Sequence, residues 1–411
     1  MTALPEWAQW KAGGAYTLGA EEEVMLLNPH DWSLAQQVDR VLPKLSEGLS
    51  AHVTPETHRS ALELTTGVHE RAEGIYDELL GLRRSLKYEL MPLGLDVASA
   101  GTHPITVWHE TVVSTHPRYE LVYGSMRELA RREPTFALHV HVAIDDPEDG
   151  IGLVNRMRAH LPVLLALSVN SPFWQGRDTG LGSARTPLFQ AFPRVGIPRE
   201  FSDYADWVEA VDLLIRCNAF PEATFLWWDV RPQPRFGTVE VRILDAQTTV
   251  AETSALAALV QCIARLEVEE GYISEPLVHA QEALDENRFV AARDGMHAEL
   301  IDPVRETRVP ALELLGGLLE ACAPHASELD CTAELRTIAS MAGRTGAQRQ
   351  LDIARSGHKL GGLVEDLADA FLREGYTVDD LELPAPRAPG RPASGAQPDR
   401  LSGEHRSEDL L

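Results

Sequence analysis

The chain has 411 residues, 44% of them hydrophobic, which is enough for one large core or two smaller ones. It carries 37 basic and 62 acidic residues, a formal net charge of −25, and no basic run. This charge repels phosphate backbones and anionic lipid, so neither nucleic acid nor a membrane surface is expected as a partner. A nucleotide substrate remains compatible, because a bound metal ion reverses the field locally.

The cysteines and the apolar stretches indicate the compartment. None of the four cysteines forms a CxxC pair, which favours structural thiols in a reducing environment over disulfides or a zinc site. Residues 1–14 show no basic region followed by an apolar stretch, and the longest apolar stretch, residues 161–169, is too short to span a bilayer. We therefore expect a cytoplasmic protein.

In chain order, short strands alternate with longer helices. Strands are expected at 16–27, 136–144, 224–231 and 238–244. Helices are expected at 71–90, 118–131, 151–169 and 203–217. Residues 173–198 are expected to form a long loop without period, and 251–373 look almost wholly helical, with breaks near Ile273 and Asp302-Pro303. The Pro-, Gly- and Ser-rich residues 384–411 are expected to be disordered, which leaves 1–383 as a single domain.

The strands alternate between apolar and polar residues, which decides between two fold classes. Helices between strands are compatible with a parallel α/β sheet, but buried parallel strands should be continuously apolar. Alternation instead predicts an α+β fold with a largely antiparallel sheet, covered by helices on one side only.

The polar faces of these strands carry charged side chains. In the first strand Glu21 and Glu23 share a face, because residues two apart in a strand point the same way. Glu22 points the other way and is expected at the surface or behind the residues of the site. In the sequence ALELTT, Glu63 projects away from its leucine neighbours. Three further pairs share a face: His139 with His141, Glu240 with Arg242, and Asp229 with Arg231.

Carboxylates that crowd one surface disfavour one another's ionisation, and bound divalent cations relieve the repulsion. Oxygen ligands with at most a histidine suit Mg²⁺ or Mn²⁺. Nucleotide phosphates would complete the coordination, with Arg242 or Arg231 stabilising the transferred phosphate. The competing interpretation is an ordinary solvated sheet face.

Several motifs occur together in a fixed order along the chain. They are YTLGAEEEVMLLNP, ALELTTG, GTHP, HVHVAI, LLALSVNSPFWQGRDTG, WWDVRPQPRFGTVEVRILDAQTT, NRFVAARDG and ELIDP. With these motifs, residues 16–355 resemble the bacterial carboxylate–amine ligases of glutamate–cysteine ligase family 2. The resemblance implies a glutamine-synthetase-like catalytic domain, with a curved, mainly antiparallel sheet whose concave face holds metals and nucleotide.

The resemblance also implies an activity. It is ATP-dependent joining of a glutamate-like carboxylate to an amine through an acyl phosphate, with Mg²⁺ (or Mn²⁺) as cofactor and ATP as co-substrate. Weak glutamate–cysteine ligase activity belongs to the same expectation. No Ser-His-Asp arrangement is needed, because metals and positioning carry such chemistry.

Site residues follow position by position from the family pattern. The implied metal ligands are Glu21, Glu23, Glu56, Glu63, His141 and Glu240. The implied nucleotide contacts are Arg242, Arg231 and His139, and the implied catalytic residues are Arg242 and Glu240. His139 is also an alternative to His141 as the metal-site histidine. His103 in GTHP is expected to shape a turn rather than bind metal.

Other functions stay open from sequence. A non-catalytic nucleotide- or metabolite-binding protein would keep the same scaffold, and a metal-dependent hydrolase would also use Glu and His ligands. Self-association through helical surfaces in 251–373 is also open, although no heptad seam is visible there.

Overall fold

Seven short strands form one sheet in the computed structural model, which describes residues 4–132 and 134–375. The strand order is β10-β11-β5-β1-β3-β2, and β4 pairs with β1 beyond the end of β5. Every pairing in this sheet is antiparallel, which confirms the α+β expectation. Its strands are β1 (Leu18–Leu27), β2 (Val53–Pro55), β3 (Ala61–Thr65), β4 (Asp96–Ala98), β5 (Ala137–Ala143), β10 (Val230–Gln233) and β11 (Thr238–Asp245).

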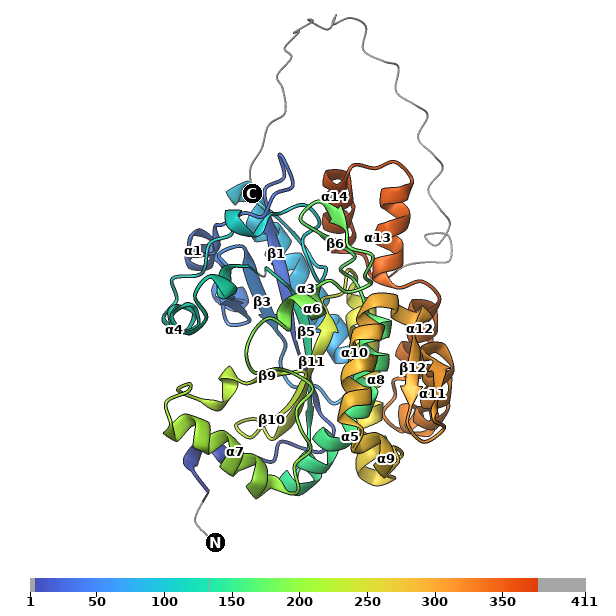
Figure 1. The fold of residues 1–411 in the computed structure, drawn as a ribbon. Coiled ribbons are helices and arrows are strands. Elements are labelled where there is room, and N and C mark those ends of the chain that lie inside the picture. The colour runs from blue at the N-terminus through green and yellow to red at the C-terminus, as the bar shows by residue number, and fades with distance from the viewer. Residues whose placement is uncertain (1–3, 133, 376–411) are drawn as a thin grey trace, which may run out of the picture.

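Long helices cover one face of this sheet (Figure 1). The nearest are α3 (Ala72–Leu90), α5 (Pro147–Ser168) and α8 (Val250–Glu269), which pack on the strands and on one another. Helix α8 is buried almost all round, because α3, α5, α11 (Ala311–Glu328) and α12 (Thr332–Gly343) surround it. The Thr249–Glu252 capping box starts this helix, since each side chain bonds the other residue's backbone N–H.

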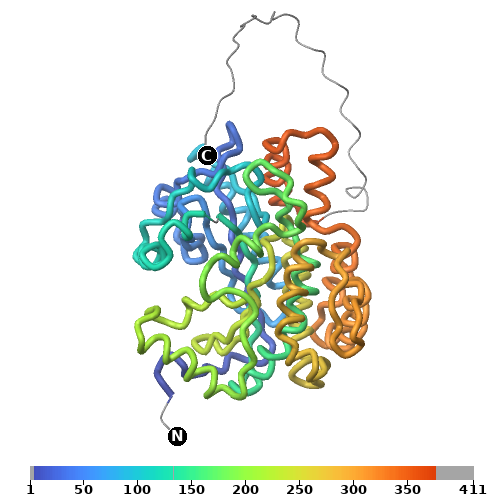
Figure 2. Tube along the Cα trace, viewed as in Figure 1, coloured from blue at the N-terminus to red at the C-terminus, as the bar shows by residue number. Residues whose placement is uncertain are grey.

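Smaller elements lie around the opposite face. They include α4 (Pro117–Met126), α6 (Arg185–Phe189) and α7 (Tyr204–Arg216), together with β8 (Val195–Gly196) and β9 (Trp227–Trp228). The N-terminal segment runs beside this region, as Figure 2 shows. There the Trp7 indole N–H donates to Asp212 at 3.2 Å, and Lys11 N–H donates to Pro234 O at 3.0 Å.

The remaining described elements complete the C-terminal half and the connections. The helices are α1 (Val38–Val41), α2 (Glu47–Ser50), α9 (Glu275–Val278), α10 (Gln281–Asp294), α13 (Gly346–Arg355) and α14 (Leu360–Ala370). The strands are β6 (Phe173–Trp174), β7 (Arg177–Asp178), β12 (Glu299–Asp302) and β13 (Thr307–Pro310). No helix in residues 4–132 and 134–375 is both long and apolar enough to cross a bilayer.

The structure differs from the expected elements in three places. The expected loop at 173–198 contains the short elements β6, β7, α6 and β8. The expected strand at 224–231 is instead a 3₁₀ turn, Ala223–Phe225, followed by the separate strands β9 and β10. Residues 251–373 are mostly helical with a break at Asp302-Pro303, as expected, but the break is the turn of a hairpin that β12 and β13 form and that was not expected. The tail at 384–411 lies outside the described residues.

Candidate active site

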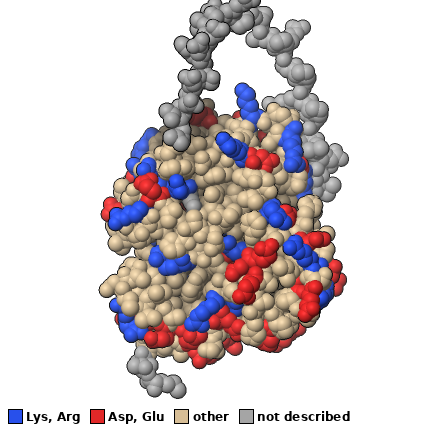
Figure 3. Space-filling model, in the orientation of Figure 1, with Lys and Arg blue, Asp and Glu red and all other residues tan. Residues whose placement is uncertain are grey.

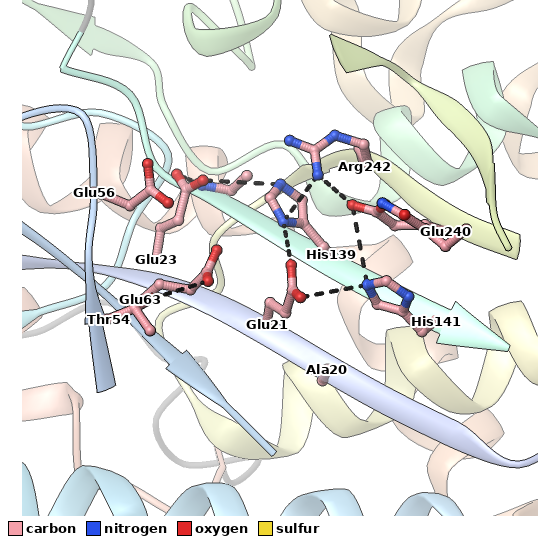
Figure 4. A network of polar contacts seen from close by, with 12 residues as sticks. Ala20, Glu21, Glu23, Thr54, Glu56, Glu63, His139, His141, Glu240 and Arg242 are labelled. Carbon is pink, nitrogen blue, oxygen red and sulfur yellow. Dashed lines mark hydrogen bonds and ion pairs between the residues drawn. The ribbon is translucent and has the colours of Figure 1, made fainter. Parts of the chain in front are cut away.

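Strand register brings the acidic and imidazole side chains together. Glu21 lies opposite His139, Glu23 opposite Glu63, and Glu240 opposite His141. Directly opposed residues in an antiparallel pair project from the same face. Three sequence-distant strand pairings therefore build one polar surface on the side away from α5 and α8 (Figure 4).

The first group of ligand atoms comes from Glu21, His139 and Glu240, which all lie within 4.8 Å of one another. The Glu21 carboxylate is 3.1 Å from His139 Nδ1 and 3.5 Å from His141 Nε2. His141 Nε2 is also 4.0 Å from Glu240. Its other nitrogen contacts the Thr238 hydroxyl at 3.0 Å, which fixes the ring so that Nε2 faces the acids.

The second group contains Glu23, Glu63 and again His139, within the same 4.8 Å limit. Glu23 Oε1 is 3.8 Å from His139 Nε2, while Glu23 Oε2 accepts the Ala137 backbone N–H at 2.7 Å. The Thr54 hydroxyl donates to Glu63 at 3.3 Å. His139 therefore lies between two acidic groups, and the structure centres the cluster on His139 rather than on His141.

Cations gather at the other end of the cluster, around Glu240. Arg231 Nε donates to its carboxylate at 2.7 Å and Gln233 Nε2 at 2.6 Å, and Arg242 forms an ion pair with it. A β-bulge places Arg242 and Ile243 where β5 has the single residue His139.

The buried Arg185 side chain satisfies the carbonyls that this bulge exposes. Its guanidinium donates to Arg242 O and Ile243 O, each at 3.0 Å. These bonds fix the bulge and hence the position of the Arg242 side chain beside Glu240.

The acidic half of the cluster is short of positive charge. Burial and then the neighbouring Glu56 raise the pKa of Glu23 to about 8. Burial and then the charges of Glu21, Glu56 and Glu23 hold the pKa of Glu63 well above its usual value. Burial likewise raises the pKa of Glu56. A cation bound among these groups would restore their ionised forms.

The other two carboxylates, Glu21 and Glu240, have lowered pKa values instead. Burial opposes ionisation of Glu21, but its hydrogen bonds with His139 and His141 outweigh burial and lower its pKa. Burial also opposes ionisation of Glu240, yet Arg231 and Arg242 hold its pKa well below the usual value. For His139, burial and then Arg242 lower the pKa to about 4, so the ring is neutral and has a lone pair to offer.

These groups open into a cavity of about 490 Å³. Seven of the predicted residues line it: Glu21, Glu23, Glu56, Glu63, His139, Arg231 and Arg242. His141 lines an adjoining, mainly apolar pocket of about 210 Å³, and Glu240 is fully buried beside His141 on the neighbouring strand. The structure thus brings all nine predicted residues to one place.

Two side chains do not lie where the sequence pattern placed them. Asp229 does not share the site with Arg231, because Arg288 binds its carboxylate at 2.5 Å behind the sheet edge. Glu22 is not a surface residue but is fully buried on the helix-covered face, paired with Arg83. His103 shapes a turn as expected, since its Nδ1 accepts the backbone N–H groups of Ile105 and Thr106.

Sequence reasoning missed three residues of the site. Gln233 lies two positions after Arg231, so strand alternation alone could have found it. Tyr119 donates its hydroxyl to Glu56 at 3.2 Å from α4, and no local pattern marks it. Phe236 lines both cavities, and its half-exposed ring in the β10–β11 turn was the available signal.

Comparison with known proteins places this site in a family. The family model described as glutamate–cysteine ligase family 2 matches residues 17–369. A Rubrobacter xylanophilus relative, provisionally named glutamate–cysteine ligase 2-1, is 38% identical over 369 residues, which cover 89% of this chain and 96% of the relative. A relative from Sorangium cellulosum is 36% identical, over 87% of this chain and 96% of its own length.

Solved structures share the fold at low sequence identity. A glutamate–cysteine ligase from Francisella tularensis, solved in complex with AMP, aligns with a TM-score of 0.61 and 14% identity, over 92% of this chain and 91% of that chain. A bifunctional glutathione synthetase from Pasteurella multocida aligns with a TM-score of 0.62 and 14% identity, over 87% of this chain and 52% of that chain. The glutamine-synthetase-like fold expected from sequence is confirmed. The protein is a carboxylate–amine ligase and belongs to glutamate–cysteine ligase family 2.

Proposed function

We propose that this ligase is ATP-dependent and activates a glutamate-like carboxylate as an acyl phosphate before an amine attacks it. One observation carries the proposal: two acid–imidazole groups share His139 on the wall of one cavity, with Arg242 beside them. That arrangement supplies what phosphoryl transfer requires, which is metal ligands, a cation for the transferred group and an enclosed space.

Mg²⁺ (or Mn²⁺) fits the residues present. The buried Nε2 atoms of His139 and His141 have no hydrogen-bond partner, although both face carboxylates. Oxygen-rich donor sets with one histidine suit a hard divalent cation, and such a cation would offset the burial and the neighbouring carboxylates that raise the pKa values of Glu23 and Glu63. In our proposal Glu21, Glu240, Glu23, Glu63 and His139 are the ligands, with His141 and Glu56 next to them. When bound, the metal would neutralise phosphate charge during transfer.

The nucleotide base would occupy the adjoining pocket of about 210 Å³. This pocket shares Glu21 and Phe236 with the main cavity, so a base held there would extend its phosphates toward the acidic groups. Exposed apolar side chains flank its mouth: Val68 is 76% and Phe236 51% exposed. An uncharged aromatic base would cover both.

In the proposed chemistry, a carboxylate oxygen of the substrate attacks the γ-phosphorus and ADP leaves. The amine nitrogen then attacks the acyl carbon, inorganic phosphate leaves, and the nitrogen gives up a proton. Arg242 would balance charge on the transferred phosphoryl group, with Arg231 holding Glu240 in place behind it. The cavity walls would exclude water, which otherwise consumes the acyl phosphate.

The proposal includes the setting of the enzyme. All four cysteines are unpaired, as expected in the reducing cytoplasm, where we place the protein. On the face shown in Figure 3, acidic and basic side chains are interspersed and form no continuous basic patch, in keeping with small-molecule substrates rather than nucleic acid.

Hydroxamate formation tests the proposal directly. Purified protein is incubated with Mg-ATP, L-glutamate and hydroxylamine, a small nucleophile that traps acyl phosphates, and both ADP and hydroxamate are measured. We expect both products in equal amounts, and a loss of about 10³-fold in Glu23→Gln and Glu240→Gln. The exposed Glu73→Gln is the matched control and should retain full activity. ATP binding without turnover would instead support the binding-protein alternative, and product without ATP the hydrolase.

A further inference from the structure

One wall of the main cavity is aromatic. The rings of Phe189, Phe192 and Trp227 form a continuous row, with centroids 5.3 Å apart for Phe189–Phe192 and 6.3 Å for Phe192–Trp227. Val122 and Met126 from α4 line the same cavity. The row comes from the end of α6, the segment after it and β9, outside the metal-facing sheet, so the chemistry of phosphoryl transfer does not explain it.

This wall meets the carboxylates directly. A recess of about 50 Å³ adjoins the cavity and is lined by Glu23 and Glu56 and by Phe189 and Phe192. Arg185 and Arg242 also line it, but Arg185 donates to backbone carbonyls and Arg242 pairs with Glu240. A ligand in this place would therefore contact carboxyl groups at one end and aromatic rings along its length. That combination suits a cationic group attached to an apolar body.

The aromatic wall is unsuited to the other two substrates. Neither Phe189, Phe192 nor Trp227 lines the pocket assigned to the nucleotide base. A carboxylate substrate would need a free cation at the wall, but the arginines that lie against its rings are engaged. Arg185 lies over Phe189 and donates to the carbonyls of Arg242 and Ile243, and Arg194 lies over Trp227 and donates to Phe225 O. Arg235 also lines the cavity, but it lies over Phe236, which borders the pocket assigned to the base.

We propose that the amine substrate is a primary amine bearing an aromatic or bulky apolar group, rather than a small amine or cysteine. The inference rests on the proposed ligase activity and names the class of its second substrate. The ammonium group enters beside Glu23 and Glu56, and the apolar group covers Phe189, Phe192 and Trp227. A CH₂SH side chain is too small to cover this row of rings, whereas a phenyl ring stacks on it.

An amine panel tests this class with Mg-ATP and L-glutamate held constant. We expect kcat/KM for phenethylamine and 3-methylbutylamine to exceed that for methylamine and cysteine by about tenfold or more. Phe189→Ser and Trp227→Ala should reduce the phenethylamine-to-methylamine ratio at least threefold, while Phe189→Leu should keep most of it. Trp228→Ala is the matched control, because its ring packs on Phe201 and lines neither cavity.

Hydroxylamine separates the two possible failures. It needs no aromatic wall, so hydroxamate formation reports the ligase chemistry alone, and thermal unfolding confirms that each variant is folded. Hydroxamate without any preference for aromatic amines over methylamine would overturn the inference and leave the proposed function standing. Absence of both ADP and hydroxamate would overturn the proposed function and, with it, the inference.

Discussion

The two faces of strand β1 differ in how completely their buried carboxylates are paired. On the helix-covered face, Glu22 is fully buried but has its hydrogen-bond partners within the protein. Arg83 Nε donates to its carboxylate at 2.8 Å, and the Thr253 hydroxyl donates at 3.0 Å. The other donors of Arg83 bond the backbone carbonyls of Thr248, Gln247 and Phe371. One residue along on either side, Glu21 and Glu23 face a cluster in which carboxylates are crowded and two histidine nitrogens lack partners.

The contrast separates structural from functional charge. A buried carboxylate that serves stability has its full set of partners within the protein. In the site, by contrast, Glu23 and Glu63 are left with raised pKa values, and in our proposal a bound cation supplies the missing charge. Local sequence cannot make this distinction, since all three glutamates stand in the run EEE.

The largest expected difference between the two faces is in stability. Glu22→Gln should lower the free energy of unfolding by about 3–5 kcal/mol, because it leaves Arg83 buried without a counter-charge. Glu63→Gln should raise the free energy of unfolding of the metal-free protein at pH 7, since a neutral amide removes the repulsion that raises the pKa of Glu63. Urea denaturation in EDTA measures both.

A double variant, Glu22→Leu with Arg83→Met, provides the control. Replacing both partners by apolar side chains should recover much of the loss, because no buried charge is left uncompensated. If Glu22→Gln lowers the free energy of unfolding by less than about 1 kcal/mol, the buried Arg83 does not depend on Glu22 for its counter-charge.

Sequence predicted the polar face of the sheet but not its geometry. Alternation was sufficient to place Glu21 with Glu23 and His139 with His141, because side-chain direction in a strand depends only on local spacing. The order of the strands could not be read, so nothing predicted that His139 lies between two acidic groups. The β-bulge at Arg242 and the pairing of Asp229 with Arg288 depend on long-range packing for the same reason.

The missed hairpin shows a second limit. Residues 299–310 form two four-residue strands inside a helical region. Segments this short carry too few periods to outweigh the surrounding helical pattern. The aromatic wall of the cavity likewise combines α4, the end of α6 with the segment after it, and β9, which only the tertiary fold brings together.

The histidines show the same difference between fully and incompletely hydrogen-bonded side chains, and His103 allows a test by pH. His103 is saturated, with its Nε2 at 2.8 Å from Trp32 O and its Nδ1 accepting two backbone N–H groups, and burial lowers its pKa to about 4. Between pH 6.5 and 4 the His103 imidazole is protonated in the unfolded chain but stays neutral in the folded chain. Stability is therefore present above pH 6.5 and is lost as pH falls, by up to about 3 kcal/mol from this residue.

His103→Asn isolates that contribution. The Asn side-chain oxygen still accepts the backbone N–H groups of Ile105 and Thr106 but does not titrate. Urea denaturation at pH 7.5, 6.5, 5.5 and 4.5 should show a shallower decline for the variant than for the parent chain. Parallel curves for the two proteins would mean that His103 accepts a proton in the folded state as readily as in the unfolded one.

Addition of magnesium should stabilise the face that lacks positive charge. At a concentration 100 times its Kd, Mg²⁺ should raise the free energy of unfolding by about 2.7 kcal/mol, since the folded chain alone assembles the site. Glu63→Gln should lose most of this increment, and the exposed Glu73→Gln should retain it. Equal increments in both variants, measured against KCl of matched ionic strength, would locate the ion elsewhere.

The smallest expected effect concerns the pocket proposed for the nucleotide base. The Phe236 ring is 51% exposed, so Phe236→Ala should change stability by no more than about 0.5 kcal/mol. It should nevertheless raise KM for ATP about tenfold, equivalent to about 1.4 kcal/mol of lost contact, with kcat little changed. Phe289→Ala removes a similarly exposed ring, 46% exposed, that does not line this pocket and should leave KM for ATP as it was. A tenfold rise confined to the amine KM would instead mean that Phe236 serves the main cavity, and the base would have to be placed outside the pocket beside Glu21.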